Sequence, residues 1–481
     1  MKTAVIGAGM AGLSAAIYAR LNGHTVDVFE QHATPGGKIR RVHRNGYVFD
    51  MGPSIIIEPW IFREPFEKAG LACPLAFDCC DPLFSIWFEG HDPFVAPADF
   101  EAMSRLLREY APEDYRSFVS VNGRLQKAMR TVRNVFFQKP IGSFADLMDP
   151  RLLRLALLLN PNQTAAAFVE QNFSSPVLRG ILSTFPAYTE HKIARSPATA
   201  LLAPFMMIQG GIFYPQGGIY RLAEAFAELA LGIGVNVQYG MPVERVYADG
   251  GRFSLLIGRN RSAPYDRLIS AIDYTRTQVL LNPHYDVSGL RPAHSYFAVA
   301  IGSNRTWDCL QHHTFVVPQD YARAHRQIDE NETPDRPPVY LCTASKSDST
   351  VAPSGKENIF AVTLVPSRVA DGWATHGERF AERLIAYLEG FGLPGLRSSI
   401  ETLEIMSPAD IEAMFGNFGG SVFGLSGEFN PLFGFRPYNR DRHFPNLLYA
   451  GATVQPGGGV PLVIRSGKFA AELAGKARSR D

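Results

Sequence analysis

Three glycines and one acidic residue near the start of the chain have types and spacing that suit chemistry. Gly7, Gly9 and Gly12 form the pattern G-x-G-x-x-G, and Glu30 follows them. In this pattern the first glycine allows a tight turn, the second lets the backbone approach a pyrophosphate, and the third lets a helix pack close to a strand. An acidic residue at this distance accepts a hydrogen bond from a ribose hydroxyl. The spacing therefore predicts a dinucleotide site.

The elements that must position these residues follow in the right order. Ala4–Ile6 is a short β-branched run typical of a buried strand, and Leu13–Leu21 has the composition of a helix that Gly23 ends. Thr25–Phe29 predicts a second strand, which delivers Glu30 at its end. A βαβ unit that binds nothing is the alternative, but the complete order of strand, turn, helix, strand and acid favours binding.

The composition limits the class of protein. The chain has 481 residues, which predicts two or three domains, and it is 46% apolar and 19% charged. Its net charge is +1, and no dense run of lysine and arginine occurs, so we expect no nucleic-acid partner. Only one G-x-G-x-x-G follows a strand, so a second dinucleotide site for a nicotinamide is not expected.

The cysteines and histidines predict no metal site. The five cysteines are Cys73, Cys79, Cys80, Cys309 and Cys342. None forms C-x-x-C, and none has zinc-ligand spacing to a histidine. A sparse, odd count suits a reducing cytosol, and we expect Cys79 and Cys80 to be buried as small hydrophobic residues. The adjacent pair His312 and His313 could bind a metal, but no further ligand spacing supports this, so we expect both at the surface.

Two apolar runs are relevant to whether the protein spans or binds a membrane. The dinucleotide motif starts close to Met1, so we expect no signal peptide, and the run Pro197–Ile208 is shorter than the ~20 residues that span a bilayer. Leu152–Leu159 is leucine-rich, broken by Arg154 and preceded by Arg151. A basic and apolar helix can lie in a membrane interface, and a buried core helix is the alternative. We expect a cytoplasmic protein, with peripheral binding to the inner face of the membrane as a hypothesis.

The order of patterns predicts two discontinuous domains. Residues 1–61, 213–290 and 413–481 form the expected nucleotide-binding domain, because they carry the βαβ start, a hairpin at Asp249–Gly251, and a closing strand (Leu447–Ala450), glycine-rich loop and helix. Residues 62–212, mostly helical by pattern, and 291–412, with strand-like runs, form the expected substrate domain.

Five longer motifs carry a family resemblance. They are PGGKIR (Pro35–Arg40), GYVFDMGPS (Gly46–Ser54), SKSDSTVAPSGKENIFAVTLVP (Ser345–Pro366), LFGFRPYNRD (Leu432–Asp441) and YAGATVQPGGGVPLVIRSGK (Tyr449–Lys468). Together they resemble the bacterial carotenoid (phytoene) desaturase-like family of the FAD-dependent amine-oxidase superfamily. Gln455 stands where that family often has histidine.

The resemblance implies a fold and a cofactor. The expected fold is α/β, with a Rossmann-type, GR2-like FAD-binding domain built from discontinuous segments and an inserted α+β substrate domain whose helical region is the candidate membrane-facing part. The cofactor implied is FAD. The cofactor-binding residues that it implies are Gly7, Ala8, Gly9, Met10, Ala11, Gly12, Glu30, Gln31, Gly36, Gly37, Lys38, Met51, Gly52, Pro53, Ser54, Val243, Gly451, Gly458, Gly459 and Val460.

Their implied roles follow the length of the cofactor. The turn glycines would hold the pyrophosphate, Glu30 the adenosine ribose, and Val243 the adenine through its backbone. Gly36–Lys38 would line the pyrophosphate and ribityl path, and Met51–Ser54 would lie beside the flavin ring. A helix that starts near Val460 would place free N–H groups and its positive dipole end at the pyrimidine side, where reduced flavin is often anionic. The alternative is that the glycines before Val460 form only a flexible loop.

The chemistry implied is removal of a hydride and a neighbouring proton from a lipophilic polyene. Flavin N5 accepts the hydride, and the electrons then pass to oxygen or a quinone. We name no catalytic residue and no metal ligand. Glu190 and His191 within Tyr188–Lys192 are candidate proton acceptors, and a solvated loop is the alternative.

Other functions remain open on the same scaffold. An amine or amino-acid oxidase would need a charged or aromatic-caged pocket. A redox-neutral isomerase would use reduced flavin. A non-enzymatic prenyl-lipid-binding protein of the GDP-dissociation-inhibitor type would need no flavin, and the closing glycine loop argues against it.

Overall fold

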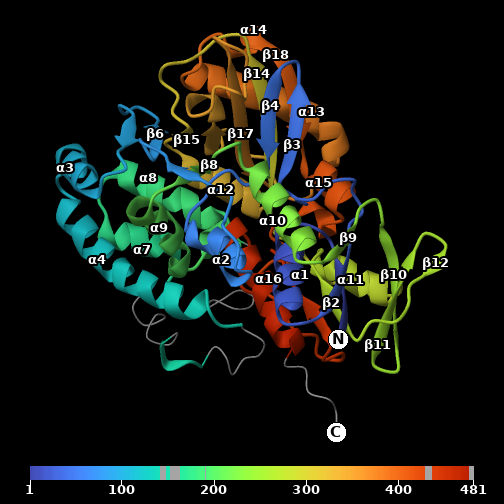
Figure 1. Cartoon of the computed structure of the whole chain (residues 1–481). Helices are drawn as coiled ribbons and strands as arrows, with labels where there is room; N and C mark the ends of the chain where they lie inside the picture. The colour runs from blue at the N-terminus through green and yellow to red at the C-terminus, as the bar shows by residue number, and fades with distance from the viewer. Residues whose placement is uncertain (141–147, 152–162, 190, 428–435, 476–481) are drawn as a thin grey trace.

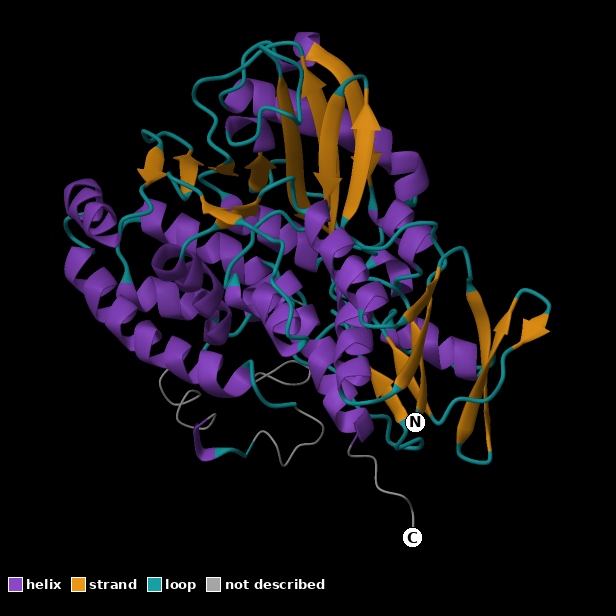
Figure 2. Ribbon diagram, viewed as in Figure 1, coloured by secondary structure: helices purple, strands orange, loops and turns teal. Residues whose placement is uncertain are grey.

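The computed structural model describes residues 1–140, 148–151, 163–189, 191–427 and 436–475. A five-stranded sheet and a seven-stranded sheet organise these residues, with helices packed around both (Figures 1 and 2). The predicted interfacial helix at Leu152–Leu159 lies outside the described residues. Within the described part, no helix combines the length and the apolar character needed to cross a membrane.

The five-stranded sheet is parallel and brings distant parts of the chain together. Its order is β19 (Leu447–Tyr449), β13 (Arg267–Ser270), β1 (Lys2–Ile6), β2 (Thr25–Phe29) and β9 (Asn236–Gln238). Every pair of neighbours runs parallel. The strands predicted around Ala4–Ile6, Thr25–Phe29 and Leu447–Ala450 are confirmed.

The two faces of this sheet follow the alternation of its side chains. Val5 and Val28 pack in the same core as helix α1 (Met10–Leu21). Ala4 and Ile6 face the other way, against a three-stranded sheet of β10 (Val243–Asp249), β11 (Arg252–Ile257) and β12 (Asn260–Arg261). Successive residues of a strand point to opposite faces, so one short run serves two cores. The predicted hairpin is β10–β11.

Helices α1 and α16 (Val460–Gly475) lie side by side although they come from opposite ends of the chain (Figure 1). Gly467 of α16 makes the contact close, because a Cβ atom there would lie 2.3 Å from the Ala11 carbonyl oxygen. The Ser14 hydroxyl donates a 2.7 Å hydrogen bond to the Ile464 carbonyl oxygen. Helix α10 (Tyr220–Gly232) also packs on α1.

The seven-stranded sheet is mostly antiparallel. Its order is β18 (Ile400–Met406), β14 (Ser295–Ser303), β17 (Glu357–Val365), β16 (Val339–Cys342), β15 (His313–Val317), β6 (Phe84–Phe88) and β7 (Phe94–Ala96). Strands β15 and β6 form its parallel pair. Phe297, Val299 and Ile301 of β14 pack against helix α13 (Trp373–Phe391), whereas Ala298 and Ala300 face the other side.

Helices of residues 60–210 gather beside this sheet (Figure 2). They include α2 (Trp60–Lys68), α3 (Phe100–Tyr110), α4 (Tyr115–Thr131), α7 (Ala165–Asn172), α8 (Pro176–Thr184) and α9 (Leu202–Gly210). The expectation that residues 62–212 are mostly helical misses β5 (Phe77–Cys79), β6 and β7. A short, fully buried apolar run such as Phe84–Phe88 has no periodicity that separates strand from helix.

Smaller elements connect these layers. They are the hairpin β3 (Arg40–Arg44) and β4 (Tyr47–Met51), strand β8 (Phe213–Pro215) beside β5, and helices α11 (Tyr274–Leu281), α12 (Tyr321–Asp329), α14 (Leu396–Ser399) and α15 (Pro408–Phe415). The five-stranded sheet draws its strands from residues 1–61, 213–290 and 413–481, and the seven-stranded sheet draws its strands from 62–212 and 291–412. The division into two domains stays a prediction.

Two expectations about single residues are wrong. His312 and His313 are 5% and 0% exposed rather than at the surface, because they lie just before and at the start of β15, a strand in the interior of the seven-stranded sheet. Cys79 is exposed, and only Cys80 of that pair is buried.

Candidate active site

One cavity of about 800 Å³ is lined by the ends of the parallel strands and by one face of the seven-stranded sheet. It passes from Glu30, through the glycine turn after β1, to the start of α16, and on to a group of aromatic and aliphatic side chains. The cavity therefore joins the predicted dinucleotide site to an apolar compartment.

The turn between β1 and α1 needs glycine for two separate reasons. Gly7 has a φ of +98°, which side chains other than glycine rarely tolerate. A Cβ atom at Gly12 would lie 1.9 Å from the Gly7 carbonyl oxygen, so only glycine lets the helix start this close to the strand. The backbone amides at the start of α1 consequently face the cavity at the positive end of the helix.

Glu30 stands where β2 ends, and its carboxylate is held on both sides. It accepts a 2.6 Å hydrogen bond from the Ala8 amide and a 2.9 Å bond from the His32 amide. The residue is 4% exposed, and it lines the cavity. Two charge-assisted bonds fix the orientation of this acceptor beside the glycine turn.

Gly36, Gly37 and Lys38 form the next part of the wall. Gly36 bridges to Gly9, and a Cβ atom at Gly37 would lie 3.1 Å from the Gly9 Cα atom. The Lys38 ammonium lies 3.4 Å from the Val422 carbonyl oxygen. Burial lowers the pKa of Lys38 to about 8, and the nearby Asp273 carboxylate opposes that shift.

Asp273 belongs to this site, although it lies in none of the motifs described above. It lines the cavity after β13 and caps α11 by accepting a 3.1 Å hydrogen bond from the Arg276 amide. Burial raises the pKa of its carboxyl, and the Arg276 amide and Lys38 act in the opposite direction. An aspartate after a buried strand and before a helix is a recognisable N-cap signal, so this position could have been found.

The start of α16 reaches the same cavity from the other end of the chain. The helix begins at Val460, as predicted, and Gly451, Gly458 and Gly459 line the cavity before it. The Ser466 hydroxyl accepts a 3.0 Å hydrogen bond from the Gly451 amide. The N–H groups of a first helical turn lack partners within the helix, so α1 and α16 both present donors and a positive dipole end to one cavity.

Most of the predicted cofactor residues line this cavity, and three do not. The Ala8 amide instead donates a hydrogen bond to Glu30. Gly12 packs closely against the Gly7 backbone, and Met51 is buried in the hydrophobic core. The other predicted residues form the wall, namely Gly7, Gly9, Met10, Ala11, Glu30, Gln31, Gly36, Gly37, Lys38, Gly52, Pro53, Ser54, Val243, Gly451, Gly458, Gly459 and Val460. Gln455 lines it too. The contact that each residue makes with a cofactor stays a prediction.

A row of side chains on the seven-stranded sheet forms one wall of the apolar compartment. Phe315 pairs with Tyr340 across β15 and β16, and Tyr340 pairs with Val362 across β16 and β17. The rings of Phe315 and Tyr340 lie 5.0 Å apart. Tyr296 of β14 continues the lining. Directly paired residues share one face of a sheet, so register alone assembles this row.

The helical region and two nearby loops supply the facing wall. The side chains that line it there are mainly apolar, and they include Ile55, Ile57, Phe185, Tyr188, Leu202, Met206 and Met207. The carboxylates among the described lining residues are Glu30, Glu244 and Asp273, which come from the nucleotide-binding strands and the loops that follow them. The apolar compartment therefore suits an uncharged, elongated molecule.

His191 differs from the solvated loop considered for it. It is 6% exposed and lines the cavity near Tyr188, whose pKa burial raises well above its usual value. Glu190 lies outside the described residues. The loop therefore brings one imidazole and one phenol to the cavity wall.

A flavin dinucleotide fits this set of residues. An elongated cavity joins a fixed carboxylate, two helix starts and glycine-lined turns, and a Cβ atom at Gly36 would lie 2.4 Å from the Ile39 carbonyl oxygen. The glycines leave the narrow passage open, and the donors match the charge of a pyrophosphate.

Comparisons with known proteins agree with this geometry. A family model described as flavin containing amine oxidoreductase matches residues 10–474. A zeta-carotene-forming phytoene desaturase of Myxococcus xanthus is 30% identical, over 97% of this chain and 92% of its own length. A 4,4'-diapolycopene oxygenase of a Methylomonas species is 29% identical, over 97% of this chain and 96% of its own length.

Solved structures share the fold at low sequence identity. An oxidoreductase of Methanosarcina mazei has a TM-score of 0.65 and 15% identity, covering 98% of this chain and 99% of its own. Cyclohexylamine oxidase of Brevibacterium oxydans has a TM-score of 0.62 and 16% identity, covering 99% and 98%. The predicted α/β fold class is confirmed, and the chain belongs to the flavin-containing amine oxidoreductase family as an oxidoreductase that uses FAD.

Proposed function

We propose that this enzyme desaturates a carotenoid or a related polyisoprenoid. The main support for this proposal is the continuous cavity, which leads from the dinucleotide site to a compartment lined by Tyr296, Phe315, Tyr340 and Val362. The names of its relatives, phytoene desaturase and diapophytoene desaturase, support the same class of substrate. An amine or amino-acid oxidase is not favoured, because the relatives that match almost the whole chain are named as desaturases and an oxygenase of carotenoid-type substrates.

Bound FAD supplies the hydride acceptor for this reaction. Glu30 would accept hydrogen bonds from the adenosine ribose, and the starts of α1 and α16 would face the anionic parts of the cofactor. Gly36, Gly37 and Lys38 would line the path between them. That all of these residues line one cavity supports the proposed roles.

The chain itself positions the polyene and excludes water. The row on the seven-stranded sheet offers a flat aromatic surface, and Met206 and Met207 on α9 face the same space with adaptable side chains. Excluding water prevents it from adding to the cation that loss of a hydride leaves on the substrate, so the cation loses a neighbouring proton instead. Loss of a hydride and of a neighbouring proton accounts for the two hydrogens removed, and the proton is acidic once its neighbouring carbon is cationic.

We further propose that the substrate enters from a membrane surface and that the electrons leave to oxygen or a quinone. A lipophilic polyene resides in the bilayer, so a peripheral enzyme gains direct access to it. The purified protein should float with liposomes in a density gradient. Protein that stays at the bottom of the gradient, and is unchanged by charge substitution at Leu157 and Leu158, would remove the membrane hypothesis.

The test of the reaction uses purified holoprotein with liposomes that carry phytoene-type polyenes, in the absence of oxygen. The visible flavin band should bleach, and the product should weigh two hydrogens less than the substrate. A flavin that no polyene bleaches would overturn the proposal, and bleaching by simple amines would replace it with an amine oxidase. Products of unchanged mass formed after the flavin has been reduced would indicate isomerisation, and products that gain oxygen when the same mixture is exposed to air would indicate an oxygenase.

A further inference from the structure

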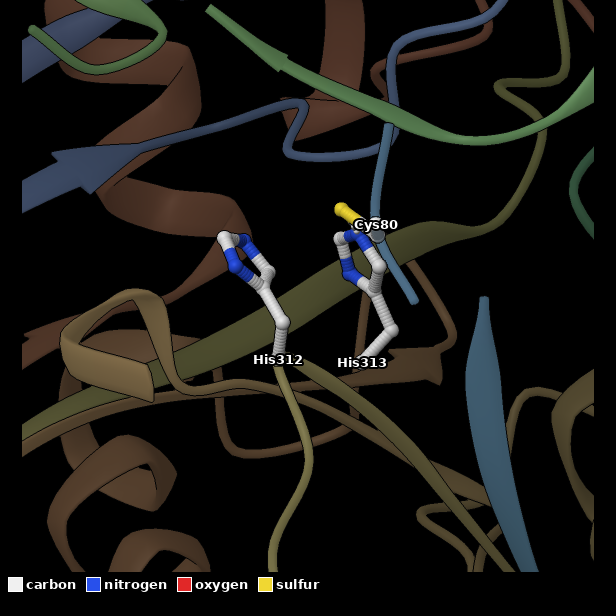
Figure 3. A group of neighbouring side chains, drawn as sticks. All are labelled: Cys80, His312 and His313. Carbon is white, nitrogen blue, oxygen red and sulfur yellow. Dashed lines mark hydrogen bonds between the residues drawn. The ribbon is translucent and has the colours of Figure 1, made fainter. Parts of the chain in front are cut away.

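Three buried side chains outside the cavity meet where β5 ends and β15 begins. Cys80 follows β5, His313 is the first residue of β15, and His312 directly precedes it. Figure 3 shows the two imidazole rings next to each other, with the sulfur of Cys80 beside His313. The ring centroids lie 4.4 Å apart, and Cys80 Sγ lies 3.6 Å from His313 Nε2. One ligand atom of each residue lies within 4.8 Å of the others.

The Nδ1 atom of each imidazole lies within hydrogen-bond distance of a hydroxyl group. His312 Nδ1 lies 2.7 Å from the Ser347 hydroxyl, and His313 Nδ1 lies 2.7 Å from the Tyr340 hydroxyl. Partners of this kind fix the tautomer and orientation of metal-binding histidines, because an N–H at Nδ1 leaves the Nε2 lone pair for the metal. The pair therefore has the supporting contacts of a ligand set.

The Nε2 atom of His312 has no hydrogen-bond partner among the described residues, although the residue is 5% exposed. An unsatisfied buried nitrogen is destabilising, so a simple hydrogen-bonded core pair does not account for it. A cation shared with His313 and Cys80 would satisfy it.

We propose that Cys80, His312 and His313 bind one Zn²⁺ ion. One thiolate and two imidazoles are a donor set that zinc prefers, and a fourth position stays open for water. Tetrahedral bonds of about 2.0–2.3 Å place the ligand atoms roughly 3.3–3.6 Å apart. The sulfur of Cys80 and the Nε2 atom of His313 already have that separation, so a small rotation of His312 completes the set.

Two neighbours of the cluster are at the surface. Cys79 is exposed and adjoins Cys80, and Ser347, the partner of His312, is exposed as well. The buried ligand atoms therefore have exposed residues next to them on two sides.

The site also adjoins the catalytic cavity through one residue. Tyr340 lines the cavity, and its hydroxyl lies between His313 Nδ1 and the Ser54 hydroxyl, which donates to it at 3.0 Å. Zinc on His313 would hold Tyr340 in its rotamer and would thereby support one wall of the apolar compartment.

The test is a calorimetric titration of Zn²⁺ into untagged holoprotein that has been freed of metal by a chelator. We expect one ion per chain by elemental analysis. Cys80→Ser and His312→Gln should each weaken binding about tenfold or more, whereas the control Cys309→Ser, at an exposed cysteine outside the cluster, should not.

X-ray absorption at the zinc edge of the unaltered, zinc-loaded protein decides the ligands without any variant. One sulfur near 2.3 Å and two imidazoles would confirm the site. Failure of the unaltered protein to bind zinc, a zinc shell without sulfur, or equal binding by Cys80→Ser would each overturn the proposal.

Discussion

The amide of Ala8 donates a 2.6 Å hydrogen bond to the carboxylate of Glu30, which ties the glycine turn after β1 to the end of β2. One side chain thereby fixes the relative position of two parts of the nucleotide site.

Replacing Glu30 with alanine should weaken FAD binding about 10–100-fold. The change leaves the amides of Ala8 and His32 without their acceptor, and such a loss costs ~1–3 kcal/mol. Fluorescence titration of the apoprotein with FAD measures the effect. The exposed Glu67 on α2 gives a matched control in Glu67→Ala, which should bind like the unaltered protein. Unchanged affinity in Glu30→Ala would contradict the role proposed for this carboxylate.

Gly12→Ala should yield a protein that is unstable and poor in flavin. The added Cβ would lie 1.9 Å from the Gly7 carbonyl oxygen, so α1 must move away from β1. The matched control is Gly390→Ala in α13, where a Cβ meets nothing within 4 Å. That change should leave stability equal or raise it by up to ~1 kcal/mol. Thermal unfolding and the flavin absorbance of the purified variants compare the two, and equal behaviour would contradict the packing argument.

Val362→Phe should lower kcat/KM for a long polyene about tenfold or more while FAD stays bound. Val362 lies in the row on the seven-stranded sheet, and a larger side chain there narrows the apolar compartment, with overpacking costing ~1–3 kcal/mol. Val95→Phe at an exposed position of β7 is the control. Anaerobic flavin bleaching measures both variants. Full activity of Val362→Phe would show that the substrate does not bind against this row of side chains.

FAD affinity should fall as the pH rises above about 8. Burial lowers the pKa of Lys38 to about 8, so the free protein holds a charged Lys38 below that pH and loses the proton above it. The anionic pyrophosphate favours the charged form, which raises this pKa in the complex. The dissociation constant should therefore increase up to ~tenfold per pH unit, starting near pH 8, until the pKa of the complex is reached.

Lys38→Met should flatten this pH dependence. Lys68→Met, at an exposed position of α2, should preserve it. Titrations of both variants between pH 6.5 and 9.5 would show the difference, and a persistent slope in Lys38→Met would assign the titration to another group.

The nucleotide-binding part of the site could be predicted from the sequence because its motif occupies one continuous stretch of the chain. Strand, turn, helix and acidic residue follow one another within the first thirty residues, and each position has a steric or hydrogen-bonding requirement that only a few residue types meet. The start of α16 was predictable for the same reason, from a strand, a glycine-rich loop and a helix.

The apolar compartment and the metal-type cluster were not predictable from local pattern. Phe315, Tyr340 and Val362 come from three strands, and only the register between the strands sets them in a row. Cys80 and His313 are 233 positions apart, so no spacing rule applies to them. The burial of His312 and His313 depends on which strands cover β15, and their own sequence does not specify those neighbours.

The pairing of α1 with α16 also has a consequence for biosynthesis. Ser14 and Ile464 are bonded across 450 positions, and β19 joins the five-stranded sheet beside β13. While the ribosome is still making the middle of the chain, the face of α1 that α16 covers has no partner, and half of the cofactor site does not yet exist. The face of α1 that α16 covers therefore stays without this partner until residues 447–475 have been made, and the complete cofactor site forms only after that point.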